Sequence, residues 1–166
     1  GIINQIGNLD ANSFDCSGQL LTPFEGQTPD PGERSLAGIF IENINGFAIG
    51  VYDNAAIVNT FDDLRNGIIA ARSNINIHYC VIEDMHGMGS DYSSPYTDMS
   101  GIGIYLVGCP SGLIRRNSIE DVYQGILTFK SNARIESNEI SDMRMGIQSE
   151  FIPVHTGMWA NILTGG

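Results

Sequence analysis

The sequence predicts an all-β fold in which short parallel strands stack in successive coils, and two observations support this prediction. The first is an internal repeat, because blocks that open on Gly-Ile begin at Gly101, Gly125 and Gly146. A period of about 20 to 50 residues is typical of stacked-repeat proteins. The second is alternation: apolar residues such as Ile75 and Ile77 lie two apart in short runs that Gly, Asn, Asp and Ser separate. Such runs are typical of strands and too short for helices.

The repeat extends along the chain as an Asn, one spacer and an apolar residue. Matching triplets start at Asn12, Asn59, Asn117, Asn138 and Asn161, and we place Gly38-Ile39-Phe40 and Cys80-Val81-Ile82 in the same frame. This frame gives about seven coils of about 21 residues, each with three short strands and three turns. Equivalent strands of neighbouring coils would pair in parallel, about 4.8 Å apart. Residues 1–166 are therefore predicted to form a single domain.

The recurring Asn residues are expected to have a structural role. Asn59, Asn117, Asn138 and Asn161 would lie above one another at an inward corner, where their amides hydrogen-bond one another and the turn backbone. Cys80 takes this position in one coil, and a small thiol is readily buried there.

Alternation within the strands also predicts which side chains form the core. The residues expected to face inward are Phe47, Ile49, Ile68 and Ala70. The residues expected to face outward are Ile69, Ala71, Leu127 and Phe129. The last two would form a small apolar patch that contacts a loop or another chain.

This pattern resembles the right-handed, single-stranded parallel β-helix of the pectin-lyase-like class, which includes carbohydrate-binding and sugar-hydrolase repeats. The resemblance covers residues 38–166 well and residues 1–37 weakly. It implies a fold more than an activity, because the repeats mark stacking positions. For catalytic members it implies a cation and a Lys or Arg base, and Arg115 is one candidate for such a base in this chain.

Composition limits the classes of function. The chain has 19 Asp and Glu against 8 Lys and Arg, a net charge of −11, which argues against nucleic acid and anionic membranes as partners. No stretch is apolar for long enough to be inserted in a membrane. The three cysteines show no CxxC spacing, so we expect neither zinc nor a disulfide. These features suit a secreted or cell-surface protein, and we expect a segment of a longer protein whose other regions, or a partner, cap the ends.

Two insertions interrupt the repeat, at residues 22–35 and 88–100. The first is rich in Pro and Gly and is expected to be a long loop. The second brings acidic and aromatic residues together, and long loops on a rigid scaffold often carry binding sites. Its candidate residues, with two just before it, are Asp84, His86, Asp91, Tyr92, Tyr96 and Asp98. We consider Tyr92 and Tyr96 for sugar binding, Asp91 and Asp98 for Ca²⁺, and Asp84, His86 and Asp98 for catalysis; alternatively, the loop packs its tyrosines on the coil.

Two further columns follow from the repeat. One consists of acidic pairs or their remnants after the corner: Glu42-Asn43, Asp62-Asp63, Glu83-Asp84, Glu120-Asp121 and Ser141-Asp142. Their recurrence favours turn capping over a catalytic site, with bound Ca²⁺ as the alternative. The other is an outward column of His78, Arg115, Glu136 and Trp159. We expect an ion pair between Arg115 and Glu136. Trp159 either offers a platform for a sugar or packs against a further coil or a partner.

These features favour a non-catalytic extracellular β-helix module that acts as a stalk or as an adhesive, glycan-contacting surface. The first alternative is a polysaccharide lyase, hydrolase or epimerase with its site on the side of the 88–100 loop. The second is a trimeric module similar to a phage tail spike.

Overall fold

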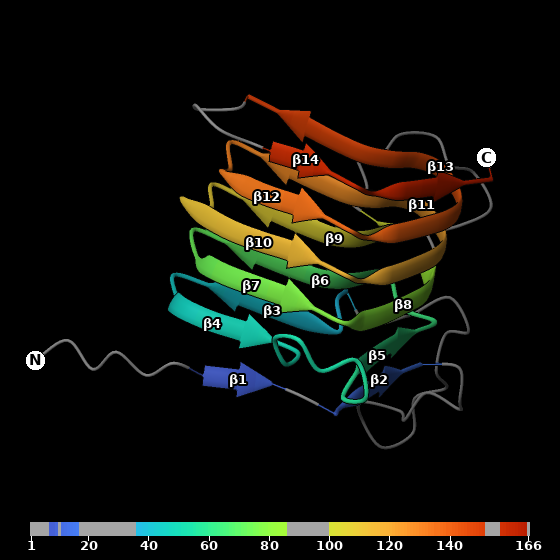
Figure 1. The fold of residues 1–166 in the computed structure, drawn as a ribbon, viewed down its shortest axis with the longest axis horizontal. Coiled ribbons are helices and arrows are strands. Elements are labelled where there is room, and N and C mark those ends of the chain that lie inside the picture. The colour runs from blue at the N-terminus through green and yellow to red at the C-terminus, as the bar shows by residue number, and fades with distance from the viewer. Residues whose placement is uncertain (1–6, 10, 17–35, 86–99, 152–156, 166) are drawn as a thin grey trace, which may run out of the picture.

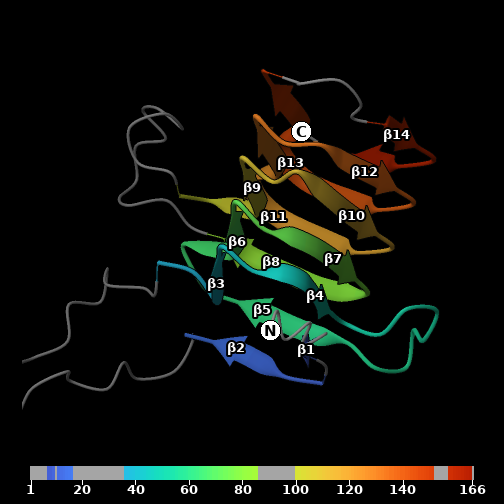
Figure 2. The ribbon, with the colours of Figure 1, turned by 90° about the vertical axis from the view of Figure 1, so that its left-hand side faces the viewer.

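The computed structural model describes residues 7–9, 11–16, 36–85, 100–151 and 157–165 of the chain. Within these residues the fold is all-β, with parallel strands in curled sheets and no helix. It follows that no helix in the described part of the chain is long and apolar enough to cross a membrane. The strands form a single stack, as Figures 1 and 2 show.

Two parallel sheets make up the stack. Sheet A contains, in spatial order, β1 (Gly7–Leu9), β4 (Asn45–Ile49), β7 (Asn74–His78), β10 (Ser111–Arg115), β12 (Ala133–Glu136) and β14 (Gly157–Trp159). Sheet B contains, in spatial order, β2 (Ser13–Asp15), β5 (Asn59–Asp62), β8 (Cys80–Met85), β11 (Ser118–Phe129), β9 (Ile102–Val107), β6 (Asn66–Ala71) and β3 (Ile39–Glu42). In addition, β13 (Glu139–Glu150) pairs with β11 and with β15 (Ile162–Thr164).

The chain passes through the sheets repeatedly, and each passage is one layer of the stack. The layers are β1-β2-β3, β4-β5-β6, β7-β8-β9, β10-β11, β12-β13 and β14-β15, from the lower end to the upper end in Figure 1. The long strand β11 pairs with β8 through its first half and with β9 through its second half, so sheet B covers two sides of the stack. Each of the five lower layers therefore has three strand segments, as the repeat predicts, and the uppermost layer has two in the described part of the chain.

The structure corrects two details of the predicted frame. Ile39 pairs with Ile68 in sheet B, so Gly38-Ile39-Phe40 belongs to the first layer and not to the Asn frame, and the described residues form six layers. Ile104 pairs with Ile126, so the equivalent of Gly125 is Gly103. The segment 101–104 reads Gly-Ile-Gly-Ile, which makes two registers look alike in the sequence.

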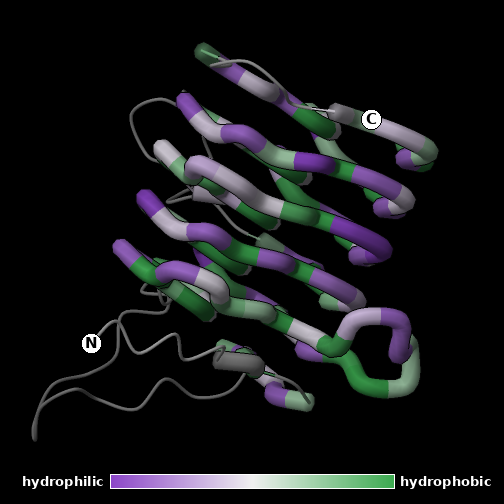
Figure 3. Tube along the Cα trace, turned by 60° about the vertical axis from the view of Figure 1, so that its left-hand side comes forward, coloured by the Kyte–Doolittle hydropathy of each residue, from purple (hydrophilic) through white to green (hydrophobic). Residues whose placement is uncertain are grey.

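The core lies between the sheets and consists of columns of inward side chains. One column contains Ile49, Ile77, Ile114 and Ile135, and each of these residues is fully buried. Burial of an Ile side chain stabilises the fold by roughly 1.5 to 3 kcal/mol. Figure 3 shows hydrophobic and hydrophilic stretches following one another along the layers.

The predicted Asn ladder is confirmed. The Asn117 Nδ2–H donates to Asn138 Oδ1 at 2.9 Å, and Asn138 Nδ2–H donates to Asn161 Oδ1 at 2.9 Å. Cys80 takes the ladder position in its layer, and its backbone N–H donates to Asn117 Oδ1 at 2.9 Å. Its thiol is unpaired and buried, and burial raises its pKa to about 12. This cysteine is a structural substitute for Asn.

The alternation predicted for the strands is largely confirmed. Ile49, Ile68 and Ala70 are buried in the core. The outward residues Ile69 and Leu127 are also buried, but in a second apolar cluster that is separate from the core. That cluster includes Ile69, Ile102, Tyr105 and Leu127, with Ala37, Val107 and Phe129 packed against it. The small apolar patch predicted at Leu127 and Phe129 is thus part of a larger one.

Left-handed backbone conformations turn the corners between strands. At the first corner, between sheet A and the first half of sheet B, the non-glycine residues with positive φ are Ala11, Asp53, Tyr79, Arg116, Ser137 and Ala160. At the second corner, within sheet B, they are Asp63, Asp84, Asp121 and Asp142. At the third corner, back to sheet A, they are Asn43, Arg72, Lys130 and Phe151. Glu42-Asn43 therefore lies at the third corner, and its predicted place among the acidic pairs is wrong.

Candidate functional site

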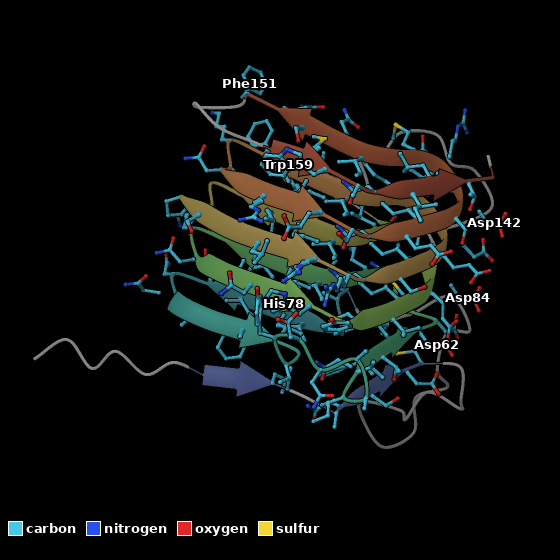
Figure 4. The ribbon with its side chains drawn as sticks, in the orientation of Figure 1. Asp62, His78, Asp84, Asp142, Phe151 and Trp159 are labelled. Carbon is cyan, nitrogen blue, oxygen red and sulfur yellow. The ribbon has the colours of Figure 1, made fainter. Side chains whose placement is uncertain are left out.

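Two corners of the stack carry charged surfaces of different character. Acidic residues follow the second corner and form what we call the acidic ridge: Asp15, Asp62, Asp63, Glu83, Asp84, Glu120, Asp121 and Asp142. A mixed cationic and aromatic surface covers the outer side of sheet A at the first corner, and we call it the cationic strip: Tyr52, Asp53, His78, Tyr79, Arg115, Arg116, Arg134, Glu136 and Trp159. Figure 4 shows Asp62, Asp84 and Asp142 along one edge of the stack, away from His78 and Trp159.

The predicted outward column forms the centre of the cationic strip. His78 pairs in register with Arg115, Arg115 with Glu136, and Glu136 with Trp159. The residues come from β7, β10, β12 and β14, so one side chain from each of the four upper layers contributes to a continuous surface. The prediction of this column is confirmed.

Arg115 and Glu136 form the predicted ion pair. The Arg115 Nε lies 3.2 Å from the Glu136 Oε1, and the two side chains are only 19% and 12% exposed. Arg115 also lies 3.6 Å from an Asp53 carboxylate oxygen, and its guanidinium is 5.1 Å from the centroid of the Tyr52 ring. Because both side chains are largely screened from water, removing one of them should cost more free energy than the roughly 1 kcal/mol at most that surface pairs contribute.

Glu136 pairs with two arginines, and one of them, Arg134, lies over the Trp159 ring. Its second carboxylate oxygen accepts from Arg134, with the Nη2 2.6 Å away. The Arg134 guanidinium lies 5.5 Å from the centroid of the Trp159 ring. Trp159 is 55% exposed, so one part of its indole remains accessible to a ligand.

Arg116 connects Asp53 and Tyr79 within the strip. Its Nη1 donates to Asp53 Oδ1 at 2.9 Å and also to the Tyr79 hydroxyl. Asp53 therefore bridges Arg115 and Arg116.

The repeat does not predict Tyr52 and Asp53 as residues of the site, because they lie in an irregular loop. Residues 50–58 separate Ile49 from Asn59, whereas Tyr79 alone separates His78 from Cys80 in the next layer. The loop departs at Gly50, whose φ is +83° and whose Cβ, if present, would lie 1.8 Å from the His78 carbonyl oxygen. Only glycine fits this position. The extra length of the chain at this corner is the feature of the sequence that indicates the loop carrying Tyr52 and Asp53.

His78 lies beneath this loop. It is 3% exposed, and the Tyr52 ring contacts it edge-on with centroids 5.5 Å apart. Burial, followed by the charge of Arg115, lowers the pKa of His78. The imidazole is therefore uncharged at neutral pH, and its Nδ1 has no hydrogen-bond partner among the described residues.

The acidic ridge has a different character. Burial, followed by the charges of Asp62, Asp84 and Glu120, raises the pKa of Glu83. In the described part of the chain, no group of three or more His, Cys, Asp or Glu side chains is placed to hold a metal ion. Repetition of acids at a left-handed corner fits the role of Asp as a turn residue.

The structure separates the predicted site residues. Arg115 and Trp159 lie together on the cationic strip, whereas Asp84 lies on the acidic ridge. The candidates His86, Asp91, Tyr92, Tyr96 and Asp98 lie outside the described residues, as do the two predicted insertions except for Ser100. The strip is thus the candidate site that the described residues support.

No family model matches the chain, and neither a curated protein nor a solved structure matches it.

Proposed function

We propose that this chain is a right-handed parallel β-helix module that contacts carbohydrate through the cationic strip and does not act as a catalyst. Three strand segments in each of the five lower layers and parallel pairing between layers support the helix. Crossover connections between parallel strands are right-handed in about 98% of cases, which supports the handedness.

The observation that carries the proposal is the placement of two exposed aromatic rings beside a network of paired charges. Tyr52 is 60% exposed and Trp159 is 55% exposed, and they contact Arg115 and Arg134 respectively. An exposed aromatic face offers an apolar surface to the C–H face of a sugar ring. Guanidinium donors and carboxylate acceptors beside it suit sugar hydroxyls.

The network also suits binding because it is already ordered. Arg115, Arg134 and Glu136 hold one another in place, so little side-chain freedom is lost when a ligand binds. Three of the eight Lys and Arg residues of a chain with net charge −11 lie on this strip. We place the module in a secreted or cell-surface protein, as a stalk or an adhesive surface.

The proposal is tested by screening the chain against acidic and neutral glycans on an array and measuring the affinity for each glycan that binds. Trp159→Ala and Tyr52→Ala should each lower the affinity at least about tenfold, which corresponds to about 1.4 kcal/mol. Phe151→Ala is the matched control, because Phe151 is another exposed aromatic residue and lies at the third corner. Equal losses in all three variants, or no glycan bound, would contradict the proposal.

Cleavage of a polysaccharide is the second candidate function, and one observation favours it. The Nδ1 of His78 has no hydrogen-bond partner among the described residues, and the imidazole lies beside Arg115, so a movement of the 50–58 loop would offer a general base to a ligand on the strip. Incubation with the same glycans, with and without Ca²⁺, should give no shorter products if the module only binds. Products that disappear in His78→Gln but persist in Asp84→Ala would favour an enzyme acting at the strip.

A further inference from the structure

The 50–58 loop is attached to the cationic strip through two side chains. The loop leaves the stack between β4 and β5, as Figure 2 shows. It keeps its own turn, because the Asn54 N–H donates to the Val51 carbonyl at 3.3 Å. The polar and aromatic contacts that it makes with the strip come from the Asp53 carboxylate and the Tyr52 ring. Detachment of the loop from the strip therefore breaks neither this turn nor a strand.

The contacts that attach the loop are individually weak. Asp53 Oδ1 lies 2.9 Å from Arg116 Nη1 and 3.6 Å from Arg115 Nη1. The side chains of Asp53 and Arg116 are 53% and 41% exposed, and exposed ion pairs contribute little to stability. The Tyr52 ring adds an edge contact with the His78 ring, whose centroid is 5.5 Å away. A small change in free energy at this surface is therefore enough to shift the loop between an attached and a detached state.

His78 lies beneath the loop, and histidine is the side chain whose charge ordinarily changes near neutral pH. It is 3% exposed, and its Nδ1 has no hydrogen-bond partner among the described residues. It pairs in register with Arg115 of β10 and lies against the Tyr52 ring. Protonation in the attached state would thus give a buried cation whose Nδ1–H lacks an acceptor and which lies beside another cation. Such a buried charge is unfavourable.

Charged groups face His78 from three elements. Burial has the largest effect and opposes its protonation, and so does Arg115 of β10. Asp53 of the loop and Glu136 of β12 favour protonation, but both carboxylates are already paired with arginines. On the other side of β7, β4 has no titratable side chain. The net result is a pKa of His78 below its ordinary value of 6.5, and contact with water after detachment would return the pKa toward that value.

The attached state therefore binds protons less tightly than the detached state. The stabilisation of the attached state is fully present above pH 6.5 and is lost as the pH falls below that value. We propose that acid detaches the 50–58 loop from the cationic strip, with His78 as the group that is protonated. One consequence rests on the proposed function: because Tyr52 belongs to the carbohydrate-contacting surface, the module binds glycan at neutral pH and releases it in acid.

Hydrogen exchange of the full chain at pH 7 and pH 5, corrected for the pH dependence of the intrinsic exchange rate, tests the detachment. Exchange of the amides of residues 51–58 should be at least about threefold faster at pH 5, while that of β10 and β12 stays the same. His78→Gln should remove the difference, because Gln is not protonated. Asp53→Ala should give fast exchange in the loop at both pH values. A pH difference that persists in His78→Gln, or a loop that is equally protected in Asp53→Ala, would overturn the inference.

Titration of the His78 ring by NMR tests the trigger. The midpoint should lie below pH 6.5 in the natural chain and closer to 6.5 in Tyr52→Ala, which removes the ring that lies against the imidazole. A midpoint above 6.5 would overturn the inference, because protonation would then hold the loop in place. Circular dichroism at pH 5 establishes that the stack stays folded.

The affinity for a glycan identified by the array tests the consequence. It should be at least about threefold lower at pH 5 than at pH 7 in the natural chain, and equal at the two pH values in His78→Gln. An affinity that falls equally in both proteins would overturn the assignment of His78 as the trigger. If no glycan binds, the proposed function fails, whereas hydrogen exchange and the His78 titration, which use the chain alone, still decide whether acid detaches the loop.

Discussion

The first and second corners of the stack share the same left-handed backbone conformation. They differ in the side chains that face the core and in those that face the surface. At both, residues with positive φ bend the chain in successive layers. Inside the first corner lies the polar Asn ladder, whereas inside the second lie Leu64, Met85, Val122 and Met143, of which the first three are buried. Outside the first corner the charges of the cationic strip are paired, whereas outside the second the acids of the ridge repel one another.

The difference shows how to separate scaffold from function in a repeat protein. The ridge has the same residue type at its corner in four layers, Asp63, Asp84, Asp121 and Asp142, which the turn itself explains. The central column of the strip has a different residue in every layer, from His78 to Trp159. Stacking does not require that variety, so the strip is where we place binding.

The largest expected effect is at the Asn ladder. Asn138 accepts from the backbone and side chain of Asn117 and donates to Asn161 Oδ1 and the Ile114 carbonyl. Asn138→Ala leaves several buried groups without partners, so we expect a loss of about 3 to 5 kcal/mol in unfolding free energy. Chemical denaturation measures this loss.

The matched change at the second corner is Asp121→Asn. Asn tolerates the φ of 48° found there, so we expect the stability to change by less than about 0.5 kcal/mol. Similar losses of unfolding free energy in Asn138→Ala and Asp121→Asn would contradict the expected difference between the two corners.

The next effect concerns the charges outside the corners. Glu136→Ala removes the shared partner of Arg115 and Arg134, and we expect a loss of about 2 kcal/mol because the pair is mostly buried. Glu120→Ala removes a ridge carboxylate that lies in register with Glu83, and it should be neutral or slightly stabilising. Thermal and denaturant unfolding of both variants compares them, and a greater loss in Glu120→Ala would contradict the account.

The smallest effect is the pH dependence of the ridge. The pKa of Glu83 in the folded protein is above its usual 4.5, so its favourable contribution is present below that pH and is lost as the pH rises through the raised pKa. Glu83→Gln should therefore be more stable than the natural chain at pH 7 by about 0.5 kcal/mol, and the difference should vanish in acid. Unfolding at several pH values measures this, and concentrated salt should shrink the difference at pH 7. A Glu83→Gln variant that is less stable at neutral pH would show that the ridge acids are held by partners.

Much of the stack could be predicted from the sequence, because two regular periods fix it. The spacing from Asn117 to Asn138 sets the layer, and alternation sets the inward side, so the ladder and the column from His78 to Trp159 follow. The rest depends on breaks in the period. The repeat does not predict the contact between Tyr52 and His78, because Tyr52 lies in an irregular loop. The Gly-Ile-Gly-Ile run at 101–104 fits two registers equally well.

The most direct test of the account is to map a bound oligosaccharide by NMR, using one that the glycan array identifies. The backbone amides of His78, Arg115, Glu136 and Trp159 should shift on titration, while those of Asp62, Glu83 and Glu120 should stay in place. Shifts that are confined to the acidic ridge would contradict the assignment of binding to the cationic strip.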